Sequence, residues 1–176
     1  RVDTTALKKF VNDKMRPLTK KGKKPSTIAV IDPPFVVLDH GQTKVSQTRV
    51  REVAVDALRT HPDIAEAFLT EEIHKMKEPY RTMYERMIYP NRSSDIMIRS
   101  HPHDWIDPGN WTTGTGHGSP YNYDTHVPII IAGPRVKRSH SSQTYDVTRI
   151  VPTISALLNM TAPAAALDPP LPAAGN

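Results

Sequence analysis

The residues best suited to chemistry lie in one glycine-rich segment, residues 112–128, in which His117 stands between Gly116 and Gly118. Glycine has no Cβ, so these neighbours let the backbone come close to whatever the imidazole binds. Imidazole is a common metal ligand, but a histidine between glycines is also an ordinary turn residue. From the spacing alone, both interpretations of His117 stay open.

Two polar side chains that follow His117 have candidate roles beside it. A histidine that binds a metal usually donates its other ring N–H to a carboxylate or a carbonyl, and Asp124 is a candidate for that acceptor. Asp124 is equally suited to turn hydrogen bonds before the next strand. His126 directly precedes an apolar stretch, and we interpret it as structural.

A second histidine pair, His101 and His103, has the His-x-His spacing that can chelate a metal. Asp104 follows one position too early for a His-x-His-x-Asp-His site, and no histidine comes after it, so the metal interpretation is the weaker one. The aromatic residues of this region either line a leaving-group pocket or hold the glycine-rich loop still. The sequence does not choose between these roles for Trp105, Trp111, Tyr121 and Tyr123.

The composition limits the chemistry. None of the 176 residues is a cysteine, which excludes disulfides and thiolate metal sites. A metal site must use histidine, carboxylate or hydroxyl ligands, which suit zinc or harder divalent ions. A chain without cysteine is compatible with an oxidising compartment, and we expect a periplasmic or secreted protein. Because the chain starts at Arg1 without a signal peptide, we also expect it to be processed or partial.

The charge and hydropathy patterns bear on partners. The net charge is +5, and much of it lies in the basic run 20–24, which is either a phosphate or nucleic-acid patch or a solvated loop. No aromatic residues interleave with the lysines for base stacking, so we favour the loop and expect no nucleic acid. No apolar stretch approaches the roughly 20 residues that span a bilayer.

The elements that must position these residues follow from apolar spacing and turn signals. The pattern predicts helices over 4–16, 46–60, 80–89 and 146–158, and strands over 27–31, 35–38, 64–69, 94–99 and 127–133. The continuous apolar run 127–133 is typical of a strand in a sheet that is covered on both faces. Residues 100–126 carry little periodicity, as in functional or disordered loops.

Together these elements predict an α/β fold. We expect four parts: an N-terminal helix with the basic loop (1–26), an accessory β-α-β layer (27–78), part of a catalytic α/β domain (79–160) and a loosely held Pro/Ala-rich tail (161–176).

Three segments resemble a known family. Residues 114–128 read Gly-Thr-Gly-His-Gly-Ser-Pro-Tyr-Asn-Tyr-Asp-Thr-His-Val-Pro, residues 89–96 read Tyr-Pro-Asn-Arg-Ser-Ser-Asp-Ile, and residues 145–153 read Tyr-Asp-Val-Thr-Arg-Ile-Val-Pro-Thr. In this order and spacing they resemble the bacterial alkaline phosphatases in the type I phosphodiesterase/nucleotide pyrophosphatase branch of the alkaline phosphatase superfamily. The likeness extends over about residues 27 to 160.

The resemblance implies a fold and a metal site. It implies a mainly parallel sheet sandwiched by helices, of which this chain is the C-terminal part. Two zinc ions hold the phosphate in that family, and the resemblance assigns His117 as a ligand of one of them. The remaining ligands and the nucleophile belong to the N-terminal half, which we expect to be the partner of this chain. The pair Asp39-His40 lacks the right context for a ligand pair.

The resemblance also implies a function. The complete protein is expected to be a zinc-dependent phosphoric ester hydrolase, an alkaline phosphatase or a phosphodiesterase, that forms a covalent phospho-Thr or phospho-Ser intermediate. The 176-residue chain alone is expected to be inactive. The alternative is a non-catalytic binding module derived from the same fold, and it predicts a surface whose apolar residues have been replaced by polar ones.

Overall fold

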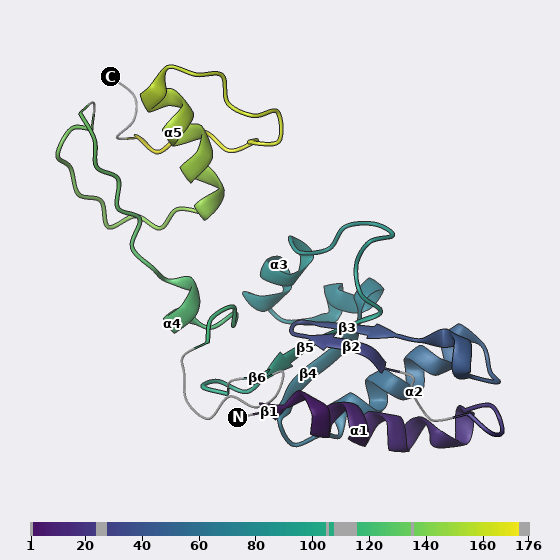
Figure 1. Ribbon diagram of the computed structural model, residues 1–176. Coiled ribbons are helices and arrows are strands. Elements are labelled where there is room, and N and C mark those ends of the chain that lie inside the picture. The colour runs from purple at the N-terminus through teal and green to yellow at the C-terminus, as the bar shows by residue number, and fades with distance from the viewer. Residues whose placement is uncertain (1, 24–27, 105, 108–115, 135, 173–176) are drawn as a thin grey trace. The chain divides into compact units, whose positions relative to one another are not determined.

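A computed structural model gives the fold of residues 2–23, 28–104, 106–107, 116–134 and 136–172. The chain forms two compact units, Arg1–Thr125 and His126–Asn176 (Figure 1). Helices and strands follow one another in the first unit, which confirms the predicted α/β class. The predicted division at residues 26, 78 and 160 stays a prediction.

A four-stranded sheet lies at the centre of the first unit, with its strands in the order β2-β3-β5-β4. All neighbouring strands in it are antiparallel, so the mainly parallel sheet that we expected is wrong for this part of the chain. The tight turn at Pro33 and Pro34 permits only antiparallel pairing of the two strands that it joins. The strands are β2 (Ile28–Asp32), β3 (Phe35–Leu38), β4 (Ile64–Leu69) and β5 (Ile96–Ser100).

The inner strand β5 is buried on both faces of the sheet. Ile96 and Ile98 belong to one hydrophobic core, and Met97 between them belongs to a second. Successive side chains of a strand point to opposite faces, so three consecutive apolar residues place this strand between two covering layers. Its last residues, Arg99 and Ser100, form hydrogen bonds with Tyr121, which lies four positions after His117 in the chain.

Helices α1 (Thr4–Met15) and α2 (Gln47–Arg59) cover one face of the sheet (Figure 1). Asp3 caps α1 by accepting hydrogen bonds from two backbone N–H groups at 2.8 and 3.1 Å. Ser46 caps α2 in the same way, as its sequence context predicts. The apolar stripes of both helices are buried in the first core: Leu7, Val11, Met15, Val50, Ala54, Ala57 and Leu58.

The opposite face of the sheet is covered by the 3₁₀ helix η3 (Thr70–Lys75) and helix α3 (Tyr80–Glu85). Buried Tyr84 donates a hydrogen bond from its hydroxyl to the carbonyl oxygen of Ile98 at 3.2 Å, which ties α3 to β5. The predicted helix over 80–89 ends early, at Glu85, because the chain turns there through a bond from the Met87 N–H to the Tyr84 carbonyl.

Short elements complete the first unit. They are β1 (Val2–Asp3), which pairs in parallel with β6 (Ile106–Asp107), the 3₁₀ helices η1 (Arg16–Leu18) and η2 (His40–Gln42), and the helix α4 (Asn122–Thr125). Of the helices in the described ranges, none is long and apolar enough to cross a membrane.

The second unit contains the 3₁₀ helix η4 (Val147–Arg149) and helix α5 (Ile150–Leu158). Pro152 is tolerated because it lies in the first turn of α5, where backbone N–H groups have no partner within the helix. The tail, which we expected to be loosely held, returns to α5: the Leu171 N–H donates to the Thr153 hydroxyl at 2.8 Å.

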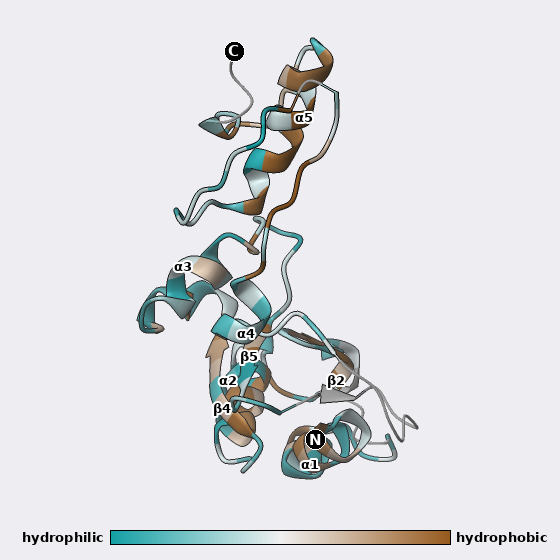
Figure 2. Ribbon diagram, turned by 90° about the vertical axis from the view of Figure 1, so that its left-hand side faces the viewer, coloured by the Kyte–Doolittle hydropathy of each residue, from teal (hydrophilic) through white to brown (hydrophobic). Residues whose placement is uncertain are grey.

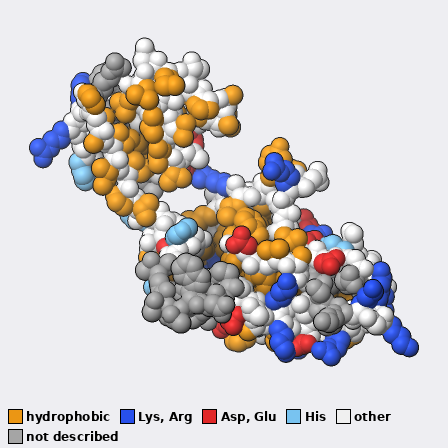
Figure 3. Space-filling model, in the orientation of Figure 1, with side chains coloured by type: hydrophobic (Ala, Val, Ile, Leu, Met, Phe, Trp, Pro, Cys, Tyr) orange, Lys and Arg blue, Asp and Glu red, His pale blue; other side chains and the backbone are white. Residues whose placement is uncertain are grey.

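The second unit also exposes many apolar side chains. Helix α5 is coloured hydrophobic over much of its surface in Figure 2, and Figure 3 shows hydrophobic side chains gathered over this unit. We call this set the apolar surface of the second unit. It consists of Val127, Ile130, Val147, Val151, Ile154, Leu158, Met160 and Leu167.

The predicted strand over 127–133 is not a strand in the structure. No strand among the described residues pairs with it. Ile130 is 85% exposed, although its apolar run predicts a buried position. A strand exists only through hydrogen bonds to a neighbour, so an apolar pattern alone does not make one.

Candidate metal and phosphate site

His117 lies on an exposed turn just before α4. The next residue, Gly118, has a φ of +93°, a conformation that side chains with a Cβ rarely adopt. Nothing lies close to the position that a Cβ would take there, so the backbone conformation, and not crowding, requires this glycine. The glycine after His117 therefore turns the chain and leaves the imidazole accessible.

The imidazole of His117 lines a pocket of about 450 Å³ within the first unit. The pocket walls come from the β2–β3 turn, from α3 and β5, from the turn after β5 and from the His117 loop itself. Its polar lining includes three carboxylates and two imidazoles, from Asp32, His103, Asp104, His117 and Asp124. No lysine or arginine lines it among the residues that the structure describes. The structure thus brings His117, His103 and Asp124 to one cavity, which their sequence separation alone did not establish.

Asp124 braces the His117 loop. Its Oδ2 accepts a hydrogen bond from the Ser119 N–H at 2.9 Å. The influence of Ser119, first through its side chain and then through its backbone N–H, together with the charge of His117, holds the pKa of Asp124 below its usual value. The turn role predicted for Asp124 is therefore present, and its role behind His117 stays a prediction.

The aromatic residues of this region divide into two roles. Tyr121 is 7% exposed, and its hydroxyl donates to the Ser100 carbonyl oxygen at 2.7 Å. Tyr123 is 49% exposed and lines the pocket; its hydroxyl accepts from the His103 N–H at 2.8 Å. The Tyr123 ring stacks on the ring of His103 at 4.9 Å and on that of Tyr121 at 5.7 Å. Trp105 and Trp111 lie outside the described residues.

The His-x-His pair does not act as a unit. The Nε2 of His101 lies 3.1 Å from the Pro62 carbonyl oxygen, whereas His103 stacks on Tyr123. Within the described ranges, no group of three or more His, Asp or Glu side chains is placed to hold a metal ion. A protein zinc site needs three or four ligands. His117, which is accessible at the pocket, can therefore supply one ligand of such a site.

The side chains of Asp39 and His40 also contact different partners in the structure. Asp39 accepts a hydrogen bond from the Gly41 N–H at 2.9 Å, while the Nε2 of His40 lies 3.1 Å from Oδ1 of Asp95. No role was assigned to Asp95 from the sequence, although this residue belongs to residues 89–96, one of the segments that resemble the family. Its role could not be read from the sequence, because its partners lie far away along the chain.

The fold of the described residues corresponds to one part of the alkaline phosphatase class of α/β proteins. The comparisons with known proteins support this class: the chain is homologous to a part of the alkaline phosphatases. No model of a protein family matches the chain.

Three comparisons identify the particular relatives. The alkaline phosphatase PafA of Elizabethkingia meningoseptica is 30% identical over 131 residues, which are 73% of this chain and 24% of PafA. PhoK of a Sphingomonas species is 26% identical over 143 residues, which are 76% of this chain and 26% of PhoK. The crystal structure of wild-type PafA matches 97% of this chain and 33% of its own, with a TM-score of 0.79 and 26% identity. By sequence, the chain spans about a quarter of these relatives.

Proposed function

We propose that the chain is the C-terminal part of a zinc-dependent phosphoric ester hydrolase, and that His117 is a ligand of one of its two zinc ions. The single observation that carries the proposal is the position of His117: an accessible imidazole at a pocket, in a chain that superimposes on PafA with a TM-score of 0.79. The substrate is a phosphate ester, and the complete protein acts as an alkaline phosphatase or a phosphodiesterase through a phospho-Thr or phospho-Ser intermediate.

The division of labour follows from the residues present. Zinc, when bound, stabilises charge on the phosphoryl oxygens and lowers the pKa of a bound hydroxyl. His117 contributes one neutral imidazole nitrogen, and Gly118 gives its loop the turn that leaves this nitrogen accessible. Asp124 and Ser119 hold the loop in shape through their hydrogen bond. The nucleophile and the other ligands are proposed to lie in sequence outside this chain, which alone is then inactive.

The apolar surface of the second unit argues against the alternative of a free-standing binding module. Such a module predicts that exposed apolar residues have been replaced by polar ones. Instead Leu158 is 60% exposed, Ile130 is 85% exposed and six other large apolar side chains of this unit are exposed as well. Large exposed apolar patches mark surfaces that pack on something else, which favours a chain that is one part of a larger enzyme.

Two experiments test the proposal. The first is to sequence the complete reading frame, which should contain an Asp, a Thr or Ser nucleophile, an Asp-x-x-x-His segment and an Asp-His pair. A frame that lacks them contradicts the proposal.

The second experiment changes His117 to Ala in the complete protein. Loss of a partner behind a metal ligand costs roughly 10- to 100-fold in affinity or activity, so loss of the ligand itself should lower phosphatase turnover at least about 100-fold. Zinc content, measured by atomic absorption, should fall by one ion per chain. His140→Ala, at an exposed histidine of the second unit, is the control and should change neither. Unchanged zinc content in His117→Ala would refute the ligand role.

A further inference from the structure

The loop that carries His117 is joined to the sheet through one buried side chain, Tyr121. Its hydroxyl donates to the Ser100 carbonyl oxygen at 2.7 Å and accepts from Nη1 of Arg99 at 2.5 Å. Both partners belong to β5. The hydroxyl therefore fixes the start of α4 to β5, the inner strand of the sheet.

Arg99 is itself held by a neighbouring strand. Its Nε and Nη2 both donate to Oε2 of Glu66 on β4, at 2.8 and 2.6 Å. Such charge-assisted hydrogen bonds between arginine and a carboxylate are stronger than neutral ones. The Arg99 guanidinium also lies 4.3 Å from the ring centroid of Tyr80, within the range of a cation–π interaction. Burial disfavours the charge of Arg99, but the hydrogen bond and charge of Glu66 outweigh it and raise the pKa of Arg99. Tyr121 is thus held by Arg99 of β5, which is itself held by Glu66 of the neighbouring strand β4.

Contacts continue from Tyr121 toward His117. The backbone N–H groups of Asp124 and Thr125 donate to the Tyr121 carbonyl oxygen at 2.8 and 3.0 Å. The carboxylate of Asp124, held by this turn, accepts from the Ser119 N–H at 2.9 Å. Ser119 follows Gly118, so a continuous series of contacts connects β4 and β5 to the residues next to His117.

We propose that Tyr121 is a positioning residue: through Asp124 and Ser119 it holds the His117 imidazole at the pocket. The consequence for zinc rests on the proposed function, whereas the anchoring of the loop does not. Glycine leaves the backbone of a turn freer than other residues do, and a binding group has to be held within about 0.5 Å of its productive position. Without the anchor, zinc binding has to order the loop and becomes weaker.

The test replaces Tyr121 by Phe, which removes the hydroxyl and keeps the ring. Tyr89→Phe is the matched control, because Tyr89 is 65% exposed and its ring contacts Arg92, far from the His117 loop in the sequence. In the 176-residue chain, hydrogen exchange of the amides in 116–125 should become at least about 10-fold faster in Tyr121→Phe and stay unchanged in Tyr89→Phe.

In the complete protein, Tyr121→Phe should bind zinc roughly 10- to 100-fold more weakly. Excess zinc should restore kcat, while the KM for a phosphate ester stays the same, because Tyr121 touches no substrate. A general loss of structure would not be repaired by zinc in this way. Glu66→Gln, which weakens the hold on Arg99 and leaves Tyr121 in place, should shift exchange and zinc affinity in the same direction by a smaller factor.

The outcomes separate the inference from the proposed function. If the wild-type complete protein neither binds zinc nor hydrolyses a phosphate ester, the proposed function fails, and hydrogen exchange alone decides whether Tyr121 anchors the loop. Wild-type exchange over 116–125 in both Tyr121→Phe and Glu66→Gln overturns the inference. Faster exchange with unchanged zinc affinity overturns its consequence for the metal.

Discussion

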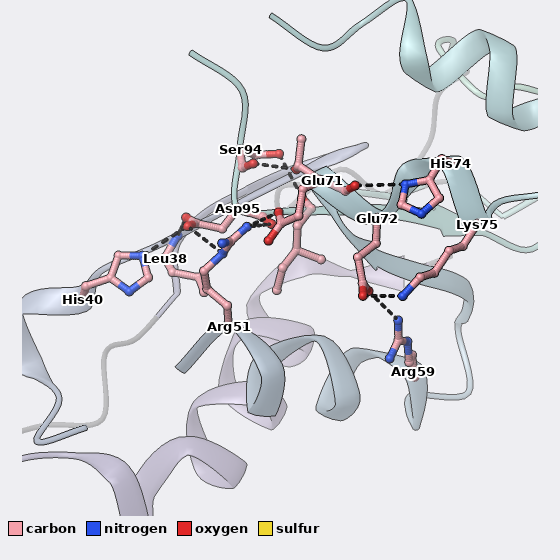
Figure 4. A network of polar contacts seen from close by, with 12 residues as sticks. Leu38, His40, Arg51, Arg59, Glu71, Glu72, His74, Lys75, Ser94 and Asp95 are labelled. Atoms are coloured by element: carbon pink, nitrogen blue, oxygen red, sulfur yellow. Dashed lines mark hydrogen bonds and ion pairs between the residues drawn. The ribbon is translucent and has the colours of Figure 1, made fainter. Parts of the chain in front are cut away.

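Asp95 joins three separate parts of the first unit at the beginning of β5 (Figure 4). Its Oδ2 accepts from the Leu38 N–H at 2.8 Å, and its Oδ1 lies 3.1 Å from Nε2 of His40 and 3.6 Å from Nε of Arg51. Arg51 in turn pairs with Glu71. The carboxylate thus contacts the end of β3, η2 and helix α2, and through Arg51 it is linked to η3. Its role is to stabilise the fold around the strand that leads to the pocket.

Replacing Asp95 by Ala should lower the free energy of unfolding by about 2 kcal/mol, since it leaves partly buried donors without an acceptor. Asp56→Ala is the control: Asp56 is exposed and pairs with Arg59 one helical turn away, so its loss should cost no more than about 0.5 kcal/mol. Urea denaturation of the 176-residue chain measures both. Equal effects would show that the contacts of Asp95 contribute nothing beyond a surface ion pair.

At the scale of the element, the beginning of α3 depends on the side chain of Glu78. Pro79 directly precedes the helix, and its ring has no group that could accept a capping hydrogen bond. Glu78 accepts instead from the Thr82 N–H at 3.2 Å, from the Thr82 hydroxyl at 3.0 Å and from Nε of Arg81 at 2.8 Å. The backbone bond to Thr82 is the largest influence that lowers the pKa of Glu78 below its ordinary value of 4.5, and Arg81 adds to it.

This shift predicts the direction of a pH effect. A carboxyl group whose pKa is lower in the folded state stabilises the fold above its unfolded pKa, and that stabilisation disappears as the pH falls through the folded value. The wild type should therefore be more stable than Glu78→Gln at pH 7, and the two should converge as the pH falls below the ordinary value of 4.5 and through the lower pKa of the folded state. Chemical denaturation at a series of pH values measures the difference. A constant difference across the series would contradict the prediction.

At the scale of the whole molecule, the apolar surface of the second unit separates the free chain from the complete protein. In the free chain, Leu158 and Ile130 are largely exposed, so replacing them by Ser should change the free energy of unfolding by no more than about 0.5 kcal/mol. If another part of the complete protein covers this surface, each replacement should cost about 1.5–3 kcal/mol there.

The control for this comparison is Lys137→Ser, an exposed charged residue of the same unit, which should be neutral in both proteins. Denaturation of the chain and of the complete protein gives the two sets of values. The same small effect of Leu158→Ser and Ile130→Ser in both would mean that nothing packs on this surface, and it would revive the binding-module alternative.

The sequence by itself determined the local features. The helices predicted over 4–16 and 46–60 are present, each capped by the polar residue directly before it, Asp3 or Ser46. The predicted order strand, strand, helix, strand over residues 28–69 is the observed one. It also singled out the segment of His117, and the resemblance that rests on that segment agrees with the homology to alkaline phosphatases. These features depend on residues close together in the chain, where periodicity and capping act.

Only the tertiary structure decided the partners. It placed β5 between β3 and β4, joined Asp95 to Leu38 across 57 positions and Arg99 to Glu66 across 33, and left the apolar run 127–133 without a neighbouring strand among the described residues. It also gave the two tyrosines different roles: Tyr121 is bonded to the sheet, whereas Tyr123 lines the pocket. An apolar pattern states that a face will be buried, but pairing and burial depend on which distant segment closes against it.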